Sequence, residues 1–136
     1  MSVLLIEYSL THLLYSLTNL APSTAPMSVT VTSITSTSFL FSWIDPPPVD
    51  HNGLIRNYTI VISELNTGNV VQLVSQTTSQ VFDSLHPDYN YSVEVAAVTV
   101  ATGPFSPALT VSTLEDGRQY LLLQVGRSML AMSQII

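Results

Sequence analysis

Three histidines are the side chains best suited to acid–base catalysis or metal binding: His12, His51 and His86. No two of them have the His-x-x-x-His spacing that places two metal ligands on one helix face. The sequence also has no Gly-x-Ser-x-Gly elbow and no glycine-rich phosphate loop. Serine and threonine are abundant, but no motif supplies the positioned base that a nucleophile needs. We therefore predict a chain without catalytic residues, in which His51 and His86 belong to loops.

Four aspartates could offer oxygen ligands to a cation. Asp45 and Asp50 flank a run of three prolines, and Asp83 and Asp88 flank Leu85. Calcium binding needs several oxygen ligands close together along a loop, and no such loop is present. We interpret these aspartates as solvated loop carboxylates, and we predict no metal and no cofactor.

Two Asn-x-Ser/Thr sequons are candidate sites of N-glycosylation, at Asn57 and Asn90. Tyr58 and Tyr91, which follow them, fall on the apolar phase of an alternating pattern. The two asparagines are therefore expected to point outward. Such sites carry glycans only in a chain that enters the secretory pathway, and short sequons also arise by chance in sequences rich in serine and threonine.

Charge excludes two classes of partner. The formal net charge is -6, and only 9% of the residues are charged. Arg56 is the only Lys or Arg between Pro22 and Asp116. Nucleic acids and anionic membranes both require clustered Lys or Arg, so neither is expected as a partner. The absence of cysteine excludes disulfides, thiolate zinc sites and a cysteine nucleophile.

The two ends of the chain differ from its middle. Residues 1–21 form a leucine-rich segment that suits a helix, and we interpret it as a signal, an anchor or the edge of a fragment. Glu7 interrupts its apolar run, and no positive region precedes it, so the signal signature is incomplete. Residues 117–136 form an apolar tail, and we expect these terminal extensions to be helical or disordered. From Tyr120 onward the stretch is shorter than the roughly 20 apolar residues of a membrane span and contains Arg127, so no clear span is predicted.

The middle of the chain, residues 22–116, is a series of short alternating runs separated by Pro, Gly, Asn and Asp. Period-two alternation indicates strands with one buried face, and many short strands indicate an antiparallel sandwich or barrel. Trp43 is in phase with Phe39 and Phe41, which predicts a core position for the indole. The seven predicted strands are residues 29–34, 38–43, 54–63, 69–75, 79–84, 91–100 and 107–113.

Four motifs in this middle part, in order, resemble the fibronectin type III domain. They are "FLFSWIDPPP" around Trp43, "NGLIRNYTI" with Tyr58, Leu85-x-Pro87-x-x-x-Tyr91, and "GPFSPALTVST" near the end. The resemblance covers roughly two thirds of the chain. Tyr89 is a mild departure, because threonine is common at that place in the family.

The resemblance implies an all-β fold: a seven-stranded antiparallel Greek-key sandwich of the immunoglobulin-like type. It also implies structural roles for three residues near the sixth strand. Tyr91 would form a tyrosine corner, with its hydroxyl bonded to backbone a few residues upstream. Leu85 would plug one end of the sandwich, and Pro87 would fix the bend.

The same resemblance places the third, sixth and seventh strands in one sheet, whose outer face would expose Val61, Ala96 and Val98. An apolar strip with little charge is a candidate partner contact. It is equally consistent with ordinary apolar surface, or with a face covered by the terminal segments. Phe105, in the loop of residues 100–105, is a second candidate, since family members use that loop in adhesion. The tripeptide Arg-Gly-Asp is absent.

The function implied is that of a non-catalytic protein-interaction or spacer module in a cell-surface, adhesion or extracellular-matrix protein. Its partners would be other proteins, including neighbouring modules of a longer chain, and its location extracellular or at the cell surface. Two alternatives stay open. One is an intracellular structural module of a cytoskeletal protein. The other is an accessory domain of a larger enzyme or receptor.

Overall fold

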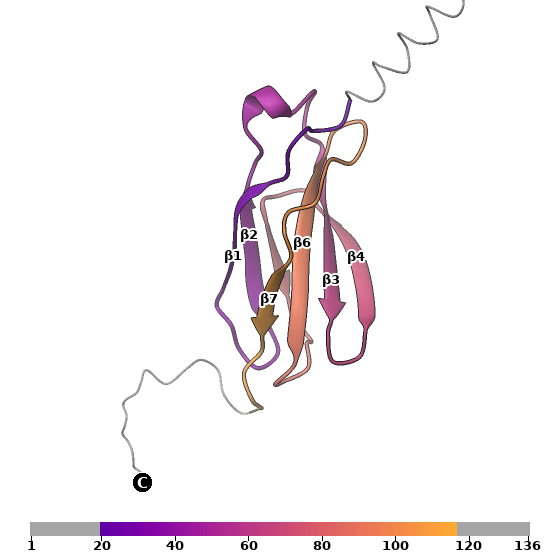
Figure 1. Ribbon diagram of the computed structural model, residues 1–136. Coiled ribbons are helices and arrows are strands. Elements are labelled where there is room, and N and C mark those ends of the chain that lie inside the picture. Colours follow the sequence, from indigo (N-terminus) through magenta and orange to yellow (C-terminus); the bar gives the residue numbers. More distant parts are fainter. Residues whose placement is uncertain (1–19, 117–136) are drawn as a thin grey trace, which may run out of the picture.

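The computed structural model describes residues 20–116, which form two antiparallel sheets packed face to face (Figure 1). The predicted seven-stranded all-β sandwich is confirmed. A single turn of 3-10 helix, η1 (Pro48–Asp50), follows the second strand. The strands are β1 (Met27–Thr32), β2 (Phe39–Ile44), β3 (Asn57–Glu64), β4 (Asn69–Ser75), β5 (Ser79–Phe82), β6 (Asn90–Val98) and β7 (Leu109–Ser112).

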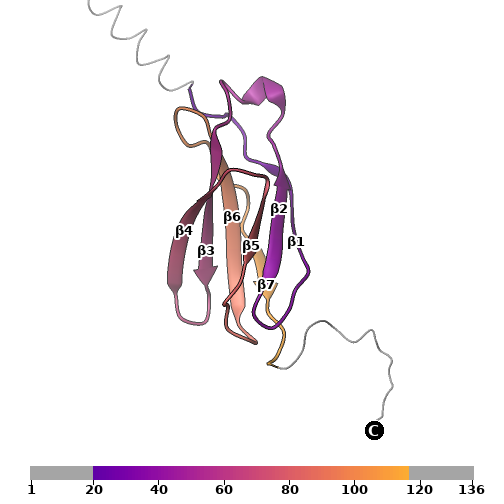
Figure 2. The ribbon, with the colours of Figure 1, turned by 180° about the vertical axis from the view of Figure 1, so that it is seen from behind.

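One sheet has the strand order β1-β2-β5, and the other has the order β4-β3-β6-β7. The chain crosses between the sheets after β2, after β4 and after β5. Strands that are neighbours in sequence are therefore often in opposite sheets, as in a Greek key. Figure 2 shows the resulting flank, where β4 and β5 are edge strands of the two sheets.

The core is built by the inner faces of β2, β3 and β6. On β2 every second side chain is buried, namely Phe39, Phe41 and Trp43. The ring centroids of Phe41 and Trp43 are 5.2 Å apart, and those of Trp43 and Tyr58 are 5.4 Å apart in an edge-on arrangement. Such contacts favour packing beyond the burial of area alone. The Trp43 indole nitrogen is buried without a hydrogen-bond partner among residues 20–116.

Four strands, β3, β5, β6 and β7, are shorter than alternation predicts. The third begins at Asn57 rather than at residue 54, because Asn52 and Gly53 have positive φ and Leu54 is left exposed in a turn. The sixth ends at Val98 rather than at residue 100. There the chain reverses, since the Thr99 N–H donates to Ala101 O at 3.2 Å and Val98 bridges to Thr102.

The first and last described residues lie at opposite ends of the sandwich (Figure 1). The N-terminal stretch is fastened to the loops at its end: Asn52 Nδ2 donates to Ala21 O at 2.9 Å. Gly103 packs so closely on Pro22 that a Cβ there would come within 2.9 Å of it. Most of segment 1–21 and all of segment 117–136 fall outside the described residues. Within residues 20–116 there is no helix long and apolar enough to cross a bilayer.

Candidate functional site

The end of the sandwich near Tyr91 is closed by a hydrogen bond from backbone to side chain. Tyr91 is buried, and its hydroxyl accepts the His86 backbone N–H at 2.9 Å, five residues upstream. Leu85 packs against the core, and its N–H donates to Thr37 O at 2.9 Å. This is the geometry of a tyrosine corner, in which one ring fixes the chain before β6.

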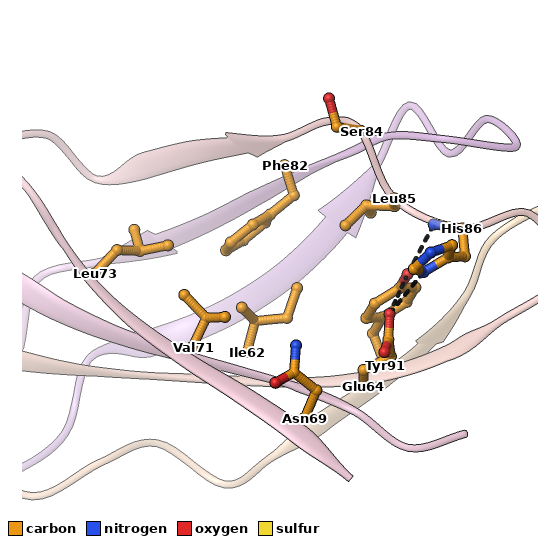
Figure 3. Close-up of a pocket in the computed structure, with 10 residues that line it drawn as sticks. All are labelled: Ile62, Glu64, Asn69, Val71, Leu73, Phe82, Ser84, Leu85, His86 and Tyr91. Carbon is orange, nitrogen blue, oxygen red and sulfur yellow. Dashed lines mark hydrogen bonds and ion pairs between the residues drawn. The ribbon is translucent and has the colours of Figure 1, made fainter. Parts of the chain in front are cut away.

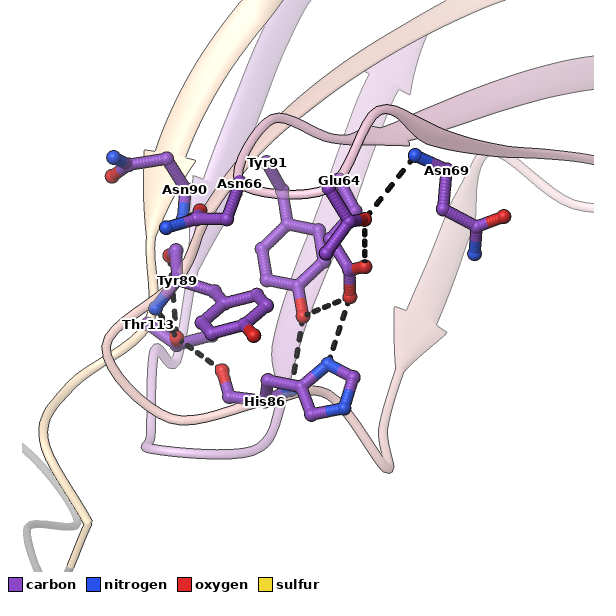
Figure 4. A network of polar contacts seen from close by, with 9 residues as sticks. Glu64, Asn66, Asn69, His86, Tyr89, Asn90, Tyr91 and Thr113 are labelled. Carbon is purple, nitrogen blue, oxygen red and sulfur yellow. Dashed lines mark hydrogen bonds and ion pairs between the residues drawn. The ribbon is translucent and has the colours of Figure 1, made fainter.

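The Glu64 carboxylate contacts the residues of this corner. Glu64, at the end of β3, accepts a hydrogen bond from the Thr67 hydroxyl and one from His86 Nδ1, the latter at 2.8 Å (Figure 4). The Tyr91 hydroxyl is 3.4 Å from the same carboxylate. The bonds from Thr67 and then from His86 hold the pKa of Glu64 below its ordinary value of 4.5. Burial raises the pKa of Tyr91 above its ordinary value of 10.0.

Thr113 fastens the chain after β7 to the same corner. Its hydroxyl accepts the Tyr89 N–H at 3.0 Å and donates to His86 O at 2.6 Å (Figure 4). The rings of His86 and Tyr89 lie 4.7 Å apart. Segments more than 20 residues apart in sequence therefore meet at one place, where all of these polar groups stabilise the fold.

A recess of about 290 Å³ lies between this corner and the β4 edge. Figure 3 shows Glu64, His86 and Tyr91 together at one end of it, and Leu73 and Val71 toward the other end. It is lined by Ile62, Glu64, Asn69, Val71, Leu73, Phe82, Ser84, Leu85, His86 and Tyr91.

The chemistry available in the recess is limited. Within the described part of the chain, no hydroxyl group is hydrogen-bonded to the His86 imidazole, which is the contact that activates a side-chain nucleophile. The same part holds no group of three or more His, Asp or Glu residues placed to share a metal ion. The carboxylate, imidazole and phenol are engaged with one another and with backbone, as in a structural network.

The outer face of the four-stranded sheet differs from expectation at one residue. Val61 and Val98 are half-buried, but Ala96 has an exposed fraction of 0%. Its short side chain lies between Thr59 of β3 and a loop that bonds to β6 on both sides of it, through Ala97 O and Val95 O. The prediction of an exposed contact at Ala96 is therefore corrected.

Phe105 belongs to that loop and has an exposed fraction of 38%. The Gly103 N–H donates to Ala97 O at 2.9 Å, and the Ser106 N–H donates to Val95 O at 2.8 Å. Ser106 Oγ accepts the Val95 N–H at 3.1 Å and is itself buried. The loop is thus held against β6, and Phe105 is presented from a fixed backbone.

The two sequon asparagines have different surroundings. Asn57 is half-buried on β3, opposite Val98, and the hydroxyl residue of its sequon, Thr59, is buried. Asn90 is exposed at the start of β6. Its Oδ1 accepts the Ser112 hydroxyl at 2.5 Å, and the amide nitrogen to which a glycan would be joined takes no part in that bond.

Trp43 and Tyr58 are enclosed in the core, where no face of the indole is open to a ligand. The Tyr58 hydroxyl donates to Asp45 Oδ1. Burial, reinforced by this carboxylate, raises the pKa of Tyr58 far above its ordinary value of 10.0. The residue pattern did not single out Glu64, Thr67 or Thr113. Their partners are distant in sequence, and nothing in their local spacing signals the contact.

The comparisons with known proteins agree with this architecture. The family model described as "Fibronectin type III domain" matches residues 24–112. Receptor-type tyrosine-protein phosphatase F of Rattus norvegicus is 33% identical over 95 residues, which cover 69% of this chain and 5% of that protein. Cell adhesion molecule DSCAML1 of Mus musculus is 36% identical over 104 residues, which cover 71% of this chain and 5% of that protein.

Solved structures with a similar fold include a fibronectin type III domain and titin domains. The FN5 domain of Drosophila Lar is 33% identical, with a TM-score of 0.55, and the match covers 69% of this chain and 98% of that domain. Titin domains A168-A170 have a TM-score of 0.61 at 19% identity, covering 70% of this chain and 33% of theirs, which shows a shared fold alone. The family model matches well over half of the chain, and the strand order and tyrosine corner agree with it. The chain therefore belongs to the fibronectin type III domain family.

Proposed function

We propose that this chain acts as a non-catalytic interaction and spacer module of a cell-surface adhesion protein. The observation that carries the proposal is the 33–36% identity to modules of a receptor-type phosphatase and a cell adhesion molecule. The chain corresponds to only 5% of the length of these relatives, so the role concerns the module and not their whole activity. The likeness to titin lies at 19% identity and does not favour the intracellular alternative.

The arrangement of the chain ends supports a spacer role. The two ends of the described chain lie at opposite ends of the sandwich, so a module before it and a module after it would follow one line (Figure 1). The hydrogen bond from Asn52 to Ala21 O holds the entering chain against the loops. This attachment would limit bending between this module and a preceding one.

The proposed contact surface combines Val61 and Val98 on the outer face of the four-stranded sheet with Phe105 in the adjoining loop. Aromatic anchors on a fixed backbone lose little conformational entropy on binding, which favours Phe105 as the central contact. The surface has few charges, in keeping with a protein partner. Substitution of Phe105 by alanine would remove the anchor and leave the loop bonds at Gly103 and Ser106 in place.

Extracellular location makes glycosylation the sharpest test of the proposal. We propose Asn90 as the modified residue, because its side chain is exposed, whereas Asn57 and its partner Thr59 are more enclosed. The full chain would be expressed in secreting eukaryotic cells, once as it stands and once behind an added secretion leader. Glycosidase treatment should increase the gel mobility of the exported protein.

Matched variants identify the modified site. Asn90→Gln should abolish most of the mobility shift, whereas Asn57→Gln should leave most of it. In protein exported without an added leader, sequencing of the mature N-terminus would show whether residues 1–21 are removed. Retention inside the cell in both arms, with no mobility shift, would contradict the proposed location.

A further inference from the structure

The sandwich has four edge strands, and only β4 lacks a feature that blocks pairing with another strand. β1 follows Pro26 and contains a bulge between Met27 and Thr30. β5 and β7 are four residues long, and Pro107 precedes β7. β4 runs for seven residues, Asn69–Ser75, with no proline and no charge, and its register with β3 is unbroken. Short strands, bulges, prolines and charges are the usual protection of an edge.

The β4 edge is also unusually apolar for its exposure. Val70, Val71 and Val74 have exposed fractions of 59%, 48% and 57%. Leu73 packs against the core only in part, and Gln72 between them is exposed. A long, uncharged and apolar edge presents unpaired backbone groups beside apolar side chains, which is the surface that strand addition uses.

The sequence of β4, Asn-Val-Val-Gln-Leu-Val-Ser, is close to a palindrome centred on Gln72. In an antiparallel pair of two such strands with Gln72 opposite Gln72, Val70 faces Val74 and Val71 faces Leu73. The polar ends also match, because Asn69 faces Ser75. Moving the centre by one residue would place Gln72 opposite a valine, so only this register pairs like with like over the whole strand.

We propose that β4 pairs antiparallel with β4 of a second copy of this chain, with Gln72 on the twofold axis. The two four-stranded sheets would then form one eight-stranded sheet with an isologous interface. Val70 and Val74 would pair on its outer face, and Val71 and Leu73 on its inner face above the recess. The proposal does not depend on the function given above, since a monomer would leave the adhesion role intact.

The acidic charge of the chain does not oppose this arrangement. Neither β4 nor β5 carries a charged side chain. The Glu64 carboxylate is held by Thr67 and His86 of its own copy. Glu94 lies on β6, so the two copies of it would be five strand spacings apart, or about 24 Å. That is well beyond the screening length of about 8 Å at physiological ionic strength.

The absence of cysteine in the chain allows a test that reads the register directly. Gln72→Cys in the full chain would place two thiols opposite each other, with Cα atoms about 5 Å apart, within disulfide range. Val74→Cys is the matched control on the same strand and face. Its two Cα atoms would be offset by four residues, about 14 Å, which is outside disulfide range.

Each variant would be equilibrated in a glutathione redox buffer, and covalent dimer would be measured on a non-reducing gel. We expect covalent dimer from Gln72→Cys and almost none from Val74→Cys. An equimolar mixture of Val70→Cys and Val74→Cys chains should give mainly the mixed dimer. Equal yields from Gln72→Cys and Val74→Cys, or no dimer from Gln72→Cys, would overturn the proposal.

A second measurement tests for the dimer in a chain without introduced thiols. In sedimentation of the cysteine-free full chain at up to about 1 mM, where weak contacts are populated, we expect a dimer. Val74→Lys should shift it to monomer, and Val81→Lys, on β5 with the same exposed fraction of 57%, should not. A monomeric wild type, or a dimer that survives Val74→Lys, would overturn the proposal.

Discussion

The two walls of the recess beside β4 are made in opposite ways. On the polar wall, Glu64, His86 and Tyr91 are hydrogen-bonded to one another, so their polar groups have partners within the chain. On the apolar wall, Val71 and Leu73 belong to β4, an edge strand whose free edge pairs with no other strand of the sandwich. The first wall stabilises the fold, and the second is available for association. The two kinds of wall thus line one recess.

The contrast follows from topology. β3 has neighbours on both sides, β4 and β6, and its last residue, Glu64, lies beside the chain that leads into β6. β4 has β3 on one side only, and the chain after it crosses to the other sheet. Substitutions on the polar wall should therefore change the free energy of unfolding. Substitutions on the apolar wall should change the oligomeric state.

The largest loss of unfolding free energy is expected for a core residue that also lines the recess. Phe82 lines the recess, is buried, and packs on Phe39 with ring centroids 5.4 Å apart. Phe82→Ala should lower the free energy of unfolding by about 3–5 kcal/mol, measured by urea denaturation. Val81→Ala, one residue earlier and exposed, is the control and should change it by less than about 0.5 kcal/mol. Equal effects of the two substitutions would contradict this placement of the core.

Tyr91→Phe tests the polar wall alone. It leaves the His86 N–H without its acceptor and should cost about 1–3 kcal/mol of unfolding free energy. Tyr89→Phe is the matched control, because the Tyr89 hydroxyl makes no hydrogen bond within residues 20–116. An unchanged denaturation midpoint for Tyr91→Phe would show that the corner does not stabilise the module.

The stability that the polar wall contributes should depend on pH, because this wall contains the Glu64 carboxylate. Its pKa is lower in the folded chain than its ordinary value of 4.5, so its stabilising effect is present above that pH and is lost as the pH falls through the folded pKa. The stability difference between wild type and Glu64→Gln should shrink over that range. Thr67→Val should bring the carboxyl pKa, followed by NMR, back toward 4.5, and a wild-type pKa at or above 4.5 would refute the network.

The smallest stability effect is expected on the apolar wall. Val74→Lys replaces an exposed side chain at the β4 edge and should change the unfolding free energy of the monomer by less than about 0.5 kcal/mol, measured in dilute solution. The comparison between the walls would fail if this substitution cost as much as Tyr91→Phe.

Much of the fold can be predicted from the residue pattern. Alternation around Phe39, Phe41 and Trp43 and around Tyr58 and Ile60 identifies buried faces, because strand periodicity is local. The motif from Leu85 to Tyr91 predicts the tyrosine corner through its resemblance to the fibronectin type III family. The strand of residues 69–75 is predicted with its observed bounds.

Contacts between distant segments could not be predicted. Ala96 has the phase of an outward residue, yet it is buried by a loop that returns ten residues later. Glu64 and His86 are 22 residues apart, and neither has a local signal of the other. Val71 has the phase of an inward residue and is nevertheless half exposed, since the opposite sheet ends at β5 and does not cover it.

We infer that the polar wall is closed within one chain and that the apolar wall is closed by a second copy. Hydrogen–deuterium exchange of the full chain, measured at low and at high protein concentration, tests both halves together. We predict that the His86 amide is protected at every concentration, and that amides on the free side of β4 gain protection only as the concentration rises. Exchange of β4 amides that does not change with concentration, or rapid exchange at His86 throughout, would contradict the account.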